Sequence, residues 1–172
     1  WGYEVFGGDS SDVSADLSSG VSQIFSNNYA FAALKDDGSV ITWGSDSTRG
    51  DSSDVSADLP SGVSQIFSNT AAFAALNEDG SVITWGFDST GGDSSDVSAD
   101  LSSDVSQIFS TGWAFAALKD DGSVITWGSD YDGGDSSDVS ADLSSGVSQI
   151  FSTEGAFLSL IHISEPTRPY WI

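Results

Sequence analysis

A unit of 42 residues repeats along almost the whole chain. The segment at residues 30–44, Ala-Phe-Ala-Ala-Leu-Lys-Asp-Asp-Gly-Ser-Val-Ile-Thr-Trp-Gly, returns with few changes at residues 72–86 and 114–128. Self-similarity at a fixed period of this length is typical of solenoids, propellers and other repeat arrays. The period therefore limits the choice of fold before any single motif is considered.

Counted from the first residue, the copies occupy residues 1–42, 43–84, 85–126 and 127–157. Trp1 falls inside the repeated hairpin segment, so we expect the chain to be a fragment of a larger array. We therefore treat residues 1–157 as one repeat array.

The repeat register is lost from Leu158 onward. The segment from Leu158 to Arg168 resembles the translated read-through of a transposase adapter used in preparing sequencing libraries. We predict that residues 158–172 are a non-native tail, and tails of this kind are left out of functional reasoning. The alternative is a genuine but divergent last strand. The only histidine, His162, lies in this segment and is not offered as a site.

Each unit contains the pattern of a small antiparallel sheet. An Asp-Gly turn between two runs rich in β-branched and aromatic residues indicates a hairpin. In the first copy we expect strands at residues 21–25, 29–35 and 39–44. The second of these is apolar on both faces, as in strands whose sheet is covered on both sides. In the first strand, alternation places Ile24 opposite Val21, Gln23 and Phe25. Stacking one copy on the next would bury both faces.

The segment from Asp9 to Leu17 predicts a short helix of one to two turns. Asp9 is a suitable N-cap, and Val13 and Leu17 would share one face that contacts the sheet. With the strands, this predicts an all-β chain of small antiparallel sheets stacked as blades, each with a short helix at its Asp-Ser-Ser-Asp segment.

The stretch from Ala33 to Gly44, Ala-Leu-Lys-Asp-Asp-Gly-Ser-Val-Ile-Thr-Trp-Gly, resembles the core signature of the regulator of chromosome condensation repeat family. The resemblance recurs at residues 75–86 and 117–128. It implies a partial β-propeller, in which each copy is one blade. The family's His-Thr is replaced by Ala30-Phe31, and the copies are shorter than is usual. Nucleotide-exchange activity is not implied, because no motif for it is present.

The chain carries 26 acidic and four basic residues, a formal net charge of −22. Nucleic-acid binding requires a basic surface, so we expect no nucleic-acid partner. Self-repulsion opposes compaction, so salt should stabilise the fold. No apolar run is long enough to span a bilayer, and we expect no membrane insertion. The absence of cysteine is compatible with a secreted or cell-surface protein.

We expect no enzymatic activity. Asp36-Asp37 and Asp120-Asp121 could be taken for a paired acid and base, but their place in a hairpin turn explains them. Outside the tail there is no His or Cys to build a nucleophile–base pair.

Repeated aspartates are candidate calcium ligands, because calcium takes six to eight oxygen ligands. The alternative is a solvated acidic cap on a helix. The candidates are Asp9, Asp12, Asp16, Asp51, Asp54, Asp93, Asp96, Asp135 and Asp138. They lead to one alternative function, a calcium-stabilised structural or adhesive module of an exported bacterial surface protein.

Aromatic residues that differ between copies are the candidate binding residues. Aromatics on variable loops above a rigid scaffold suit recognition, although they could also reflect neutral drift between copies. The candidates are Tyr3, Tyr29, Phe87, Trp113 and Tyr131. The leading hypothesis is a protein-interaction scaffold with a protein partner; a glycan binder using Trp113 and Tyr29 is a further alternative. Unprotected end sheets could also associate edge to edge.

Overall fold

The computed structural model describes residues 3, 6–45, 59 and 61–161. Within these residues the secondary structure consists of short antiparallel strands and 3₁₀ turns, without an α-helix. The strands are β1 (Val21–Ser26), β2 (Ala30–Lys35), β3 (Val40–Gly44), β4 (Val63–Ser68), β5 (Ala72–Asn77), β6 (Val82–Gly86), β7 (Val105–Ser110), β8 (Ala114–Lys119), β9 (Val124–Gly128), β10 (Val147–Ser152) and β11 (Phe157–Ile161).

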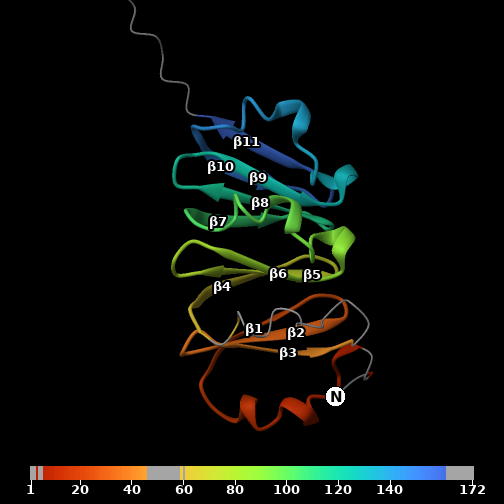
Figure 1. Cartoon of the computed structure of the whole chain (residues 1–172). Coiled ribbons are helices and arrows are strands. Elements are labelled where there is room, and N and C mark those ends of the chain that lie inside the picture. Colours follow the sequence, from red (N-terminus) through yellow and green to blue (C-terminus); the bar gives the residue numbers. More distant parts are fainter. Residues whose placement is uncertain (1–2, 4–5, 46–58, 60, 162–172) are drawn as a thin grey trace, which may run out of the picture.

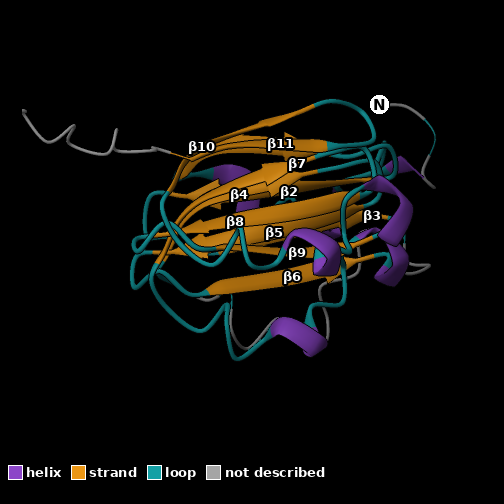
Figure 2. Ribbon diagram, turned by 90° about the horizontal axis from the view of Figure 1, so that it is seen from above, coloured by secondary structure: helices purple, strands orange, loops and turns teal. Residues whose placement is uncertain are grey.

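The strands form four separate sheets, one for each repeat. Among the described residues, three sheets have three strands in chain order and the fourth consists of β10 and β11. Figure 1 shows the sheets stacked one on the next, from β1–β2–β3 to β10–β11. Viewed along the stack, strands of successive sheets overlie one another and loops gather at the strand ends (Figure 2). The predicted all-β fold, part of a β-propeller built from repeated blades, is confirmed.

Alternation along the central strand explains the stacking. On β5, Phe73 and Ala75 face the first sheet, where they pack with Ala32 and Leu34. Ala74 on the same strand faces the third sheet and packs with Phe115 there. Alanine side chains on both faces of the central strand allow the sheets to approach closely. The ring of Phe73 fills the remaining space between the first and second sheets. Each sheet is therefore buried by its neighbours in the stack.

A β-bulge at the start of the first strand of every repeat changes one predicted face. In the second copy, Val63 pairs with Asn77 whereas Gln65 pairs with Leu76, so one residue is extra. Val63 and Ile66 consequently pack in the same core cluster, and Phe67 packs in the next. The first strand of the first copy has the same bulge. The prediction that Val21 and Ile24 lie on opposite faces of this strand is therefore wrong, because strict alternation does not allow for the extra residue.

In the first, third and fourth copies the short helix expected at the Asp-Ser-Ser-Asp segment is present as 3₁₀ turns, the form usual for such short pieces. The same segment of the second copy, residues 51–54, lies outside the described residues. They are η2 (Ser11–Val13), η3 (Asp16–Ser18), η6 (Ser95–Val97) and η8 (Ser137–Val139); η5 (Asp88–Thr90) and η7 (Asp130–Asp132) follow the third strands. Beyond η6, Leu101 is only 1% exposed, and its carbonyl oxygen accepts a hydrogen bond from the Val82 backbone N–H at 2.9 Å. The segment that connects the second sheet to the third is thus held against the second sheet by a backbone hydrogen bond.

The fourth sheet keeps the pairing of the others through Ile161. Ile150 pairs with Ser159, as Ile108 pairs with Ala117 in the third sheet. Backbone pairing depends little on side-chain identity, so this register does not decide the origin of residues 158–172. The division into an array at 1–157 and a non-native tail stays a prediction, and residues 162–172 lie outside the described part.

Candidate binding site at the aromatic edge

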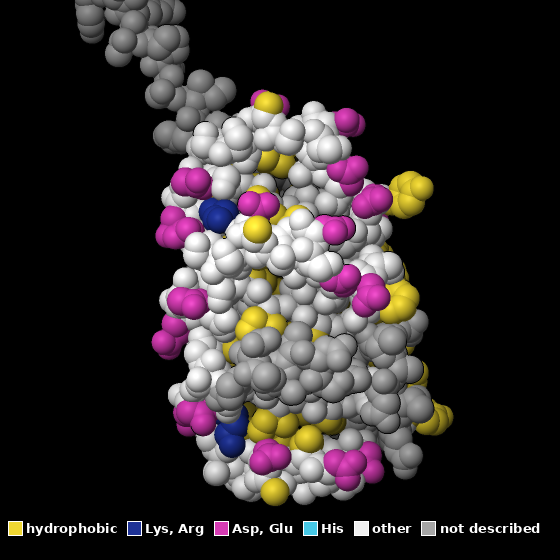
Figure 3. Space-filling model, in the orientation of Figure 1, with side chains coloured by type: hydrophobic (Ala, Val, Ile, Leu, Met, Phe, Trp, Pro, Cys, Tyr) yellow, Lys and Arg dark blue, Asp and Glu magenta, His cyan; other side chains and the backbone are white. Residues whose placement is uncertain are grey.

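The strands of every sheet end at two opposite edges of the stack, and these edges differ in chemistry. One edge carries the Asp-Gly hairpin turns. The other carries the turns between the first two strands of each repeat and the loops that follow each third strand. Figure 3 shows acidic side chains along both edges, and hydrophobic side chains that project from one of them. We call the second edge the aromatic edge; its exposed members are Tyr3, Phe6, Phe87, Trp113 and Tyr131, with Tyr29 half-buried.

A ladder of backbone hydrogen bonds joins the turns of successive copies along this edge. The Asn28 N–H donates to the Thr70 carbonyl at 3.2 Å, and the Thr70 N–H donates to the Gly112 carbonyl at 3.1 Å. The Gly112 N–H in turn donates to the Glu154 carbonyl at 2.7 Å. Turns that are normally mobile surface features are therefore held in a fixed row.

In the first three copies, a side chain inside the turn fixes its shape. Asn69 is 9% exposed, and its Oδ1 accepts hydrogen bonds from the N–H groups of Ala71 (3.1 Å) and Ala72 (2.9 Å). In the next copy Thr111 does the same: its Oγ1 accepts from the Ala114 N–H at 3.0 Å. Sequence reasoning missed these residues, although their place directly after each first strand is a signal typical of Asx and Ser/Thr turns.

The loop after each third strand is tied to the same turn. The Ser129 N–H donates to the Trp113 carbonyl at 3.0 Å, and the Phe87 N–H donates to the Ala71 carbonyl at the same distance. Gly128 makes this approach feasible, because a Cβ there would lie 2.8 Å from the Trp113 carbonyl oxygen. Its φ of +108° also disfavours any other residue. Each of these loops is thus held by a hydrogen bond to the backbone of the turn between the first two strands.

The structure brings the predicted binding residues to one edge. Tyr131 is 98% exposed and Tyr3 is 80% exposed, whereas Trp113 and Phe87 are about two-fifths exposed. Tyr29 contacts Phe6, with ring centroids 6.0 Å apart. Phe6 is absent from the predicted set, yet it links Tyr29 to Tyr3 through an edge-to-face contact of 6.4 Å. The exposed aromatic side chains thus lie on loops that backbone hydrogen bonds hold in place.

The hairpin turns at the opposite edge are capped by their own aspartates. Asp121 accepts a hydrogen bond from the Ser123 N–H at 2.9 Å. Hydrogen bonds from the Ser123 hydroxyl and N–H lower the pKa of the Asp121 carboxyl below its usual value. Asp37 and Asp79 have their pKa lowered in the same way, by Ser39 and Ser81. These carboxylates are turn caps, which supports the sequence interpretation of Asp36-Asp37 as structural.

Three of the candidate calcium ligands hold the turn just before a 3₁₀ segment. The N-cap of η2 is Ser10, so the prediction of Asp9 as the N-cap is wrong by one residue, because the helix begins one position later. Asp9, Asp93 and Asp135 each accept a hydrogen bond from the N–H two residues on, at 2.9 Å. Asp12, Asp96 and Asp138 lie in the first turns of η2, η6 and η8, and Asp16 in that of η3. Asp93, Asp96 and Asp135 line one hollow of about 530 Å³. Among the described residues, no group of three acidic side chains is placed to hold a metal ion. Asp51 and Asp54 lie outside these residues.

Melting measurements with different salts would test the calcium prediction. Because screening of a net charge of −22 is not specific for one cation, CaCl₂, MgCl₂ and NaCl at equal ionic strength should raise Tm to within about 2 °C of one another. Chelator-treated protein in NaCl is the control. A larger rise with calcium alone would contradict this expectation and favour a calcium-stabilised module.

The fold and this edge define an all-β repeat protein, an arc of β-propeller blades with one edge rich in exposed aromatics. No protein-family model matches the sequence, and a comparison with curated proteins finds no match. Across the described part of the chain, no helix has the length and apolar character needed to cross a bilayer.

Among solved structures, the chain is similar to the ectodomain of the Physcomitrella patens receptor kinase CR4, at 14% identity and a TM-score of 0.49, over 87% of this chain and 36% of that one. It is also similar to human WBSCR16, at 17% identity and a TM-score of 0.49, over 83% and 45%. A third is the CRINKLY WD40 ectodomain of the Arabidopsis thaliana receptor kinase ACR4, at 20% identity and a TM-score of 0.43, over 61% and 36%. The chain thus spans less than half the length of each. Likenesses this distant add no argument about function.

Proposed function

We propose that this chain is a non-enzymatic scaffold that binds a protein partner through its aromatic edge. The observation that carries the proposal is the row of exposed aromatic side chains on loops fixed by hydrogen bonds between copies. Aromatic residues dominate the energetics of protein interfaces. A surface that is already ordered loses little conformational entropy when a partner binds.

Variation between copies supports recognition by this edge. The core positions are nearly identical in the first three repeats, whereas the aromatic position reads Tyr29, Ala71, Trp113 and Gly155 in successive copies. The backbone scaffold is therefore the same from copy to copy, whereas the side chains that it presents along the aromatic edge differ. A partner would be selected by the order of large and small residues along the row.

The family assignment supports the same function. We propose that the array belongs to the regulator of chromosome condensation repeat family, on the signature that ends at Trp43-Gly44, Trp85-Gly86 and Trp127-Gly128. In the first three blades this signature spans the central strand, the Asp-Gly hairpin and the third strand.

Replacing three edge aromatics should weaken partner binding strongly without unfolding the chain. A variant with Tyr29→Ser, Trp113→Ser and Tyr131→Ser is compared with the wild-type chain by quantitative affinity capture, followed by a Kd measurement on the partner recovered. We expect Kd to rise by about tenfold or more, because single interface hot spots contribute about 2 kcal/mol. Tm is measured in parallel to show that the variant is folded.

The matched control is Phe151→Ser, which removes an aromatic side chain that is 51% exposed on the first strand of the fourth sheet. This change should leave the Kd unaltered. Equal binding by the triple variant and the wild-type chain would overturn the proposal. Binding of the wild-type chain to oligosaccharides on a glycan array, lost in the same variant, would instead assign the edge to carbohydrate recognition.

A further inference from the structure

In three successive sheets, the aromatic edge presents one aromatic side chain beside one small residue. In each sheet the loop after the third strand donates a backbone hydrogen bond of 3.0 Å to the turn between the first two strands; the pairs are Ser45 to Tyr29, Phe87 to Ala71 and Ser129 to Trp113. The aromatic residue belongs to the turn in the first and third sheets and to the loop in the second. Each sheet therefore contributes a single aromatic residue at this pair of positions.

The stacking of the sheets sets the spacing of this row. Stacked sheets lie about 10 Å apart, and Figure 1 shows the three sheets one above the next. A bound segment that meets each sheet in the same way must repeat over a similar distance. A polyproline II helix completes a turn of three residues in about 9 Å, whereas side chains on one face of a β-strand recur every ~6.6 Å. The spacing therefore favours polyproline II, a conformation that aromatic-lined grooves recognise.

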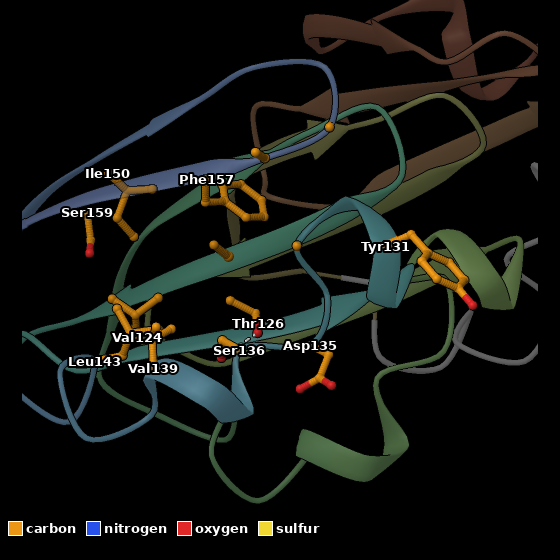
Figure 4. Close-up of a pocket in the computed structure, with 14 residues that line it drawn as sticks. Val124, Thr126, Tyr131, Asp135, Ser136, Val139, Leu143, Ile150, Phe157 and Ser159 are labelled. Carbon is orange, nitrogen blue, oxygen red and sulfur yellow. Dashed lines mark hydrogen bonds between the residues drawn. The ribbon is translucent and has the colours of Figure 1, made fainter.

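Carboxylates accompany the aromatic residues in the loops of this edge. Phe87 is followed by the exposed Asp88, and Tyr131 follows the exposed Asp130. Figure 4 shows the Tyr131 ring on its loop, apart from the apolar side chains of the sheets. Both aspartates line the hollow of about 530 Å³ between these loops, together with Asp93, Asp96 and Asp135. The loops thus combine exposed rings with negative charge.

The turn of the fourth sheet places a further carboxylate beside Trp113. The Gly112 N–H donates to the Glu154 carbonyl at 2.7 Å, and a Cβ on Gly112 would lie 3.6 Å from Glu154 Cγ. Trp113 is 41% exposed, and the Glu154 side chain is exposed as well. An arginine side chain suits such a pair, because its guanidinium group stacks on an indole and also binds a carboxylate.

The lysines of the described residues lie away from these carboxylates. They are Lys35 and Lys119, whose Nζ atoms donate to the backbone carbonyls of Asp16 (3.0 Å) and Asp100 (2.7 Å). Neither lysine lines the hollow. A basic partner therefore complements this part of the edge, and the net charge of −22 would steer such a partner toward the protein.

We propose that the aromatic edge binds a proline-rich segment of its partner in which arginine recurs at every third position. This partner chemistry depends on the proposed function, because it assigns a ligand to the same edge. At that period the arginines face the edge on every turn, so that successive guanidinium groups meet Phe87 with Asp88 and Trp113 with Glu154. The prolines hold the segment in the polyproline II conformation before binding, which reduces the entropy lost on binding.

Labelled peptides test the proposal directly. A fluorescein-labelled peptide of Arg-Pro-Pro repeats, long enough to cover three sheets, is titrated with the full chain and followed by fluorescence anisotropy. The control is a peptide of Arg-Gly-Ser repeats, which has the same length and charge but is flexible. We expect saturable binding of the proline peptide, and a Kd about tenfold or more higher for the control. If the proline peptide does not bind, or if both peptides bind equally, the proposal is wrong.

Two charge variants locate the binding. Glu154→Gln removes the carboxylate beside Trp113 and should raise the Kd of the proline peptide about threefold or more. Asp36→Asn removes an exposed carboxylate at the edge of the hairpin turns and should leave this Kd unchanged. Circular dichroism shows whether each variant is folded. Equal effects of the two changes would overturn the proposal, because binding would then follow net charge alone.

The triple variant with Tyr29→Ser, Trp113→Ser and Tyr131→Ser separates this proposal from the proposed function. It should bind both the recovered partner and the proline peptide more weakly than the wild-type chain does. If it loses the partner but binds the peptide as before, the edge recognises proteins through other chemistry and the arginine–proline proposal is wrong. If it still binds the partner, the proposed function is wrong.

Discussion

Trp127→Ala is expected to lower the free energy of unfolding by about 3–5 kcal/mol, the usual cost of truncating a large buried aromatic side chain. Trp127 is 5% exposed and stacks on the fully buried Phe115. Its removal opens a cavity between the second and third sheets and leaves the Gly91 carbonyl without the Nε1 donor. Urea unfolding followed by circular dichroism measures the change.

Two variants separate the contributions to this loss. Trp127→Phe keeps an aromatic ring but loses the Nε1 hydrogen bond, so it should cost clearly less than alanine. Trp43→Ala removes the same residue type where it is only half-buried, under the first sheet of the stack, and should also cost less. If the losses at Trp43 and Trp127 were equal, the stacking of sheets would not be the source of stability.

Asn69→Ala is expected to cost about 2–3 kcal/mol, because it removes several hydrogen bonds of about 1 kcal/mol each from a buried turn. Besides accepting from two backbone N–H groups, Asn69 donates from Nδ2 to the Thr90 carbonyl at 2.6 Å. The substitution leaves these groups buried and unpaired. Thermal and urea unfolding would both report the loss.

The neighbouring repeat supplies the matched control. Thr111 occupies the equivalent position, and its Oγ1 accepts from the Ala114 N–H. Asn69→Thr should therefore retain most of the stability that Asn69→Ala loses. A threonine variant as unstable as the alanine variant would contradict this expectation.

The core of each blade could be predicted from the sequence because it depends on local pattern. The central strand was predicted to be apolar on both faces, and the structure places its neighbouring residues Phe73 and Ala74 in different core clusters. The Asp-Gly turn located the hairpin, and the 42-residue period implied that each sheet is covered by its neighbours.

The remaining features depend on geometry that sequence pattern does not encode. The bulge between Val63 and Gln65 adds one residue without a glycine or proline to mark it, so alternation misplaced the first residue of that strand type. The exposed aromatics were identified by their variation between copies. The hydrogen bonds that order them, such as that from Thr70 to Gly112, join residues one whole repeat apart. Only the stacked structure shows that these positions form one row.

The near-identity of the interfaces between sheets has an evolutionary consequence. In a stack where every unit contacts only its neighbours, stability is close to a sum of unit and interface terms. A whole 42-residue unit could then be duplicated or deleted by recombination at matching positions without creating a new kind of interface. Such events would lengthen or shorten the row of loops while conserving the structure beneath it, so new combinations of surface residues could arise without redesign of the interior.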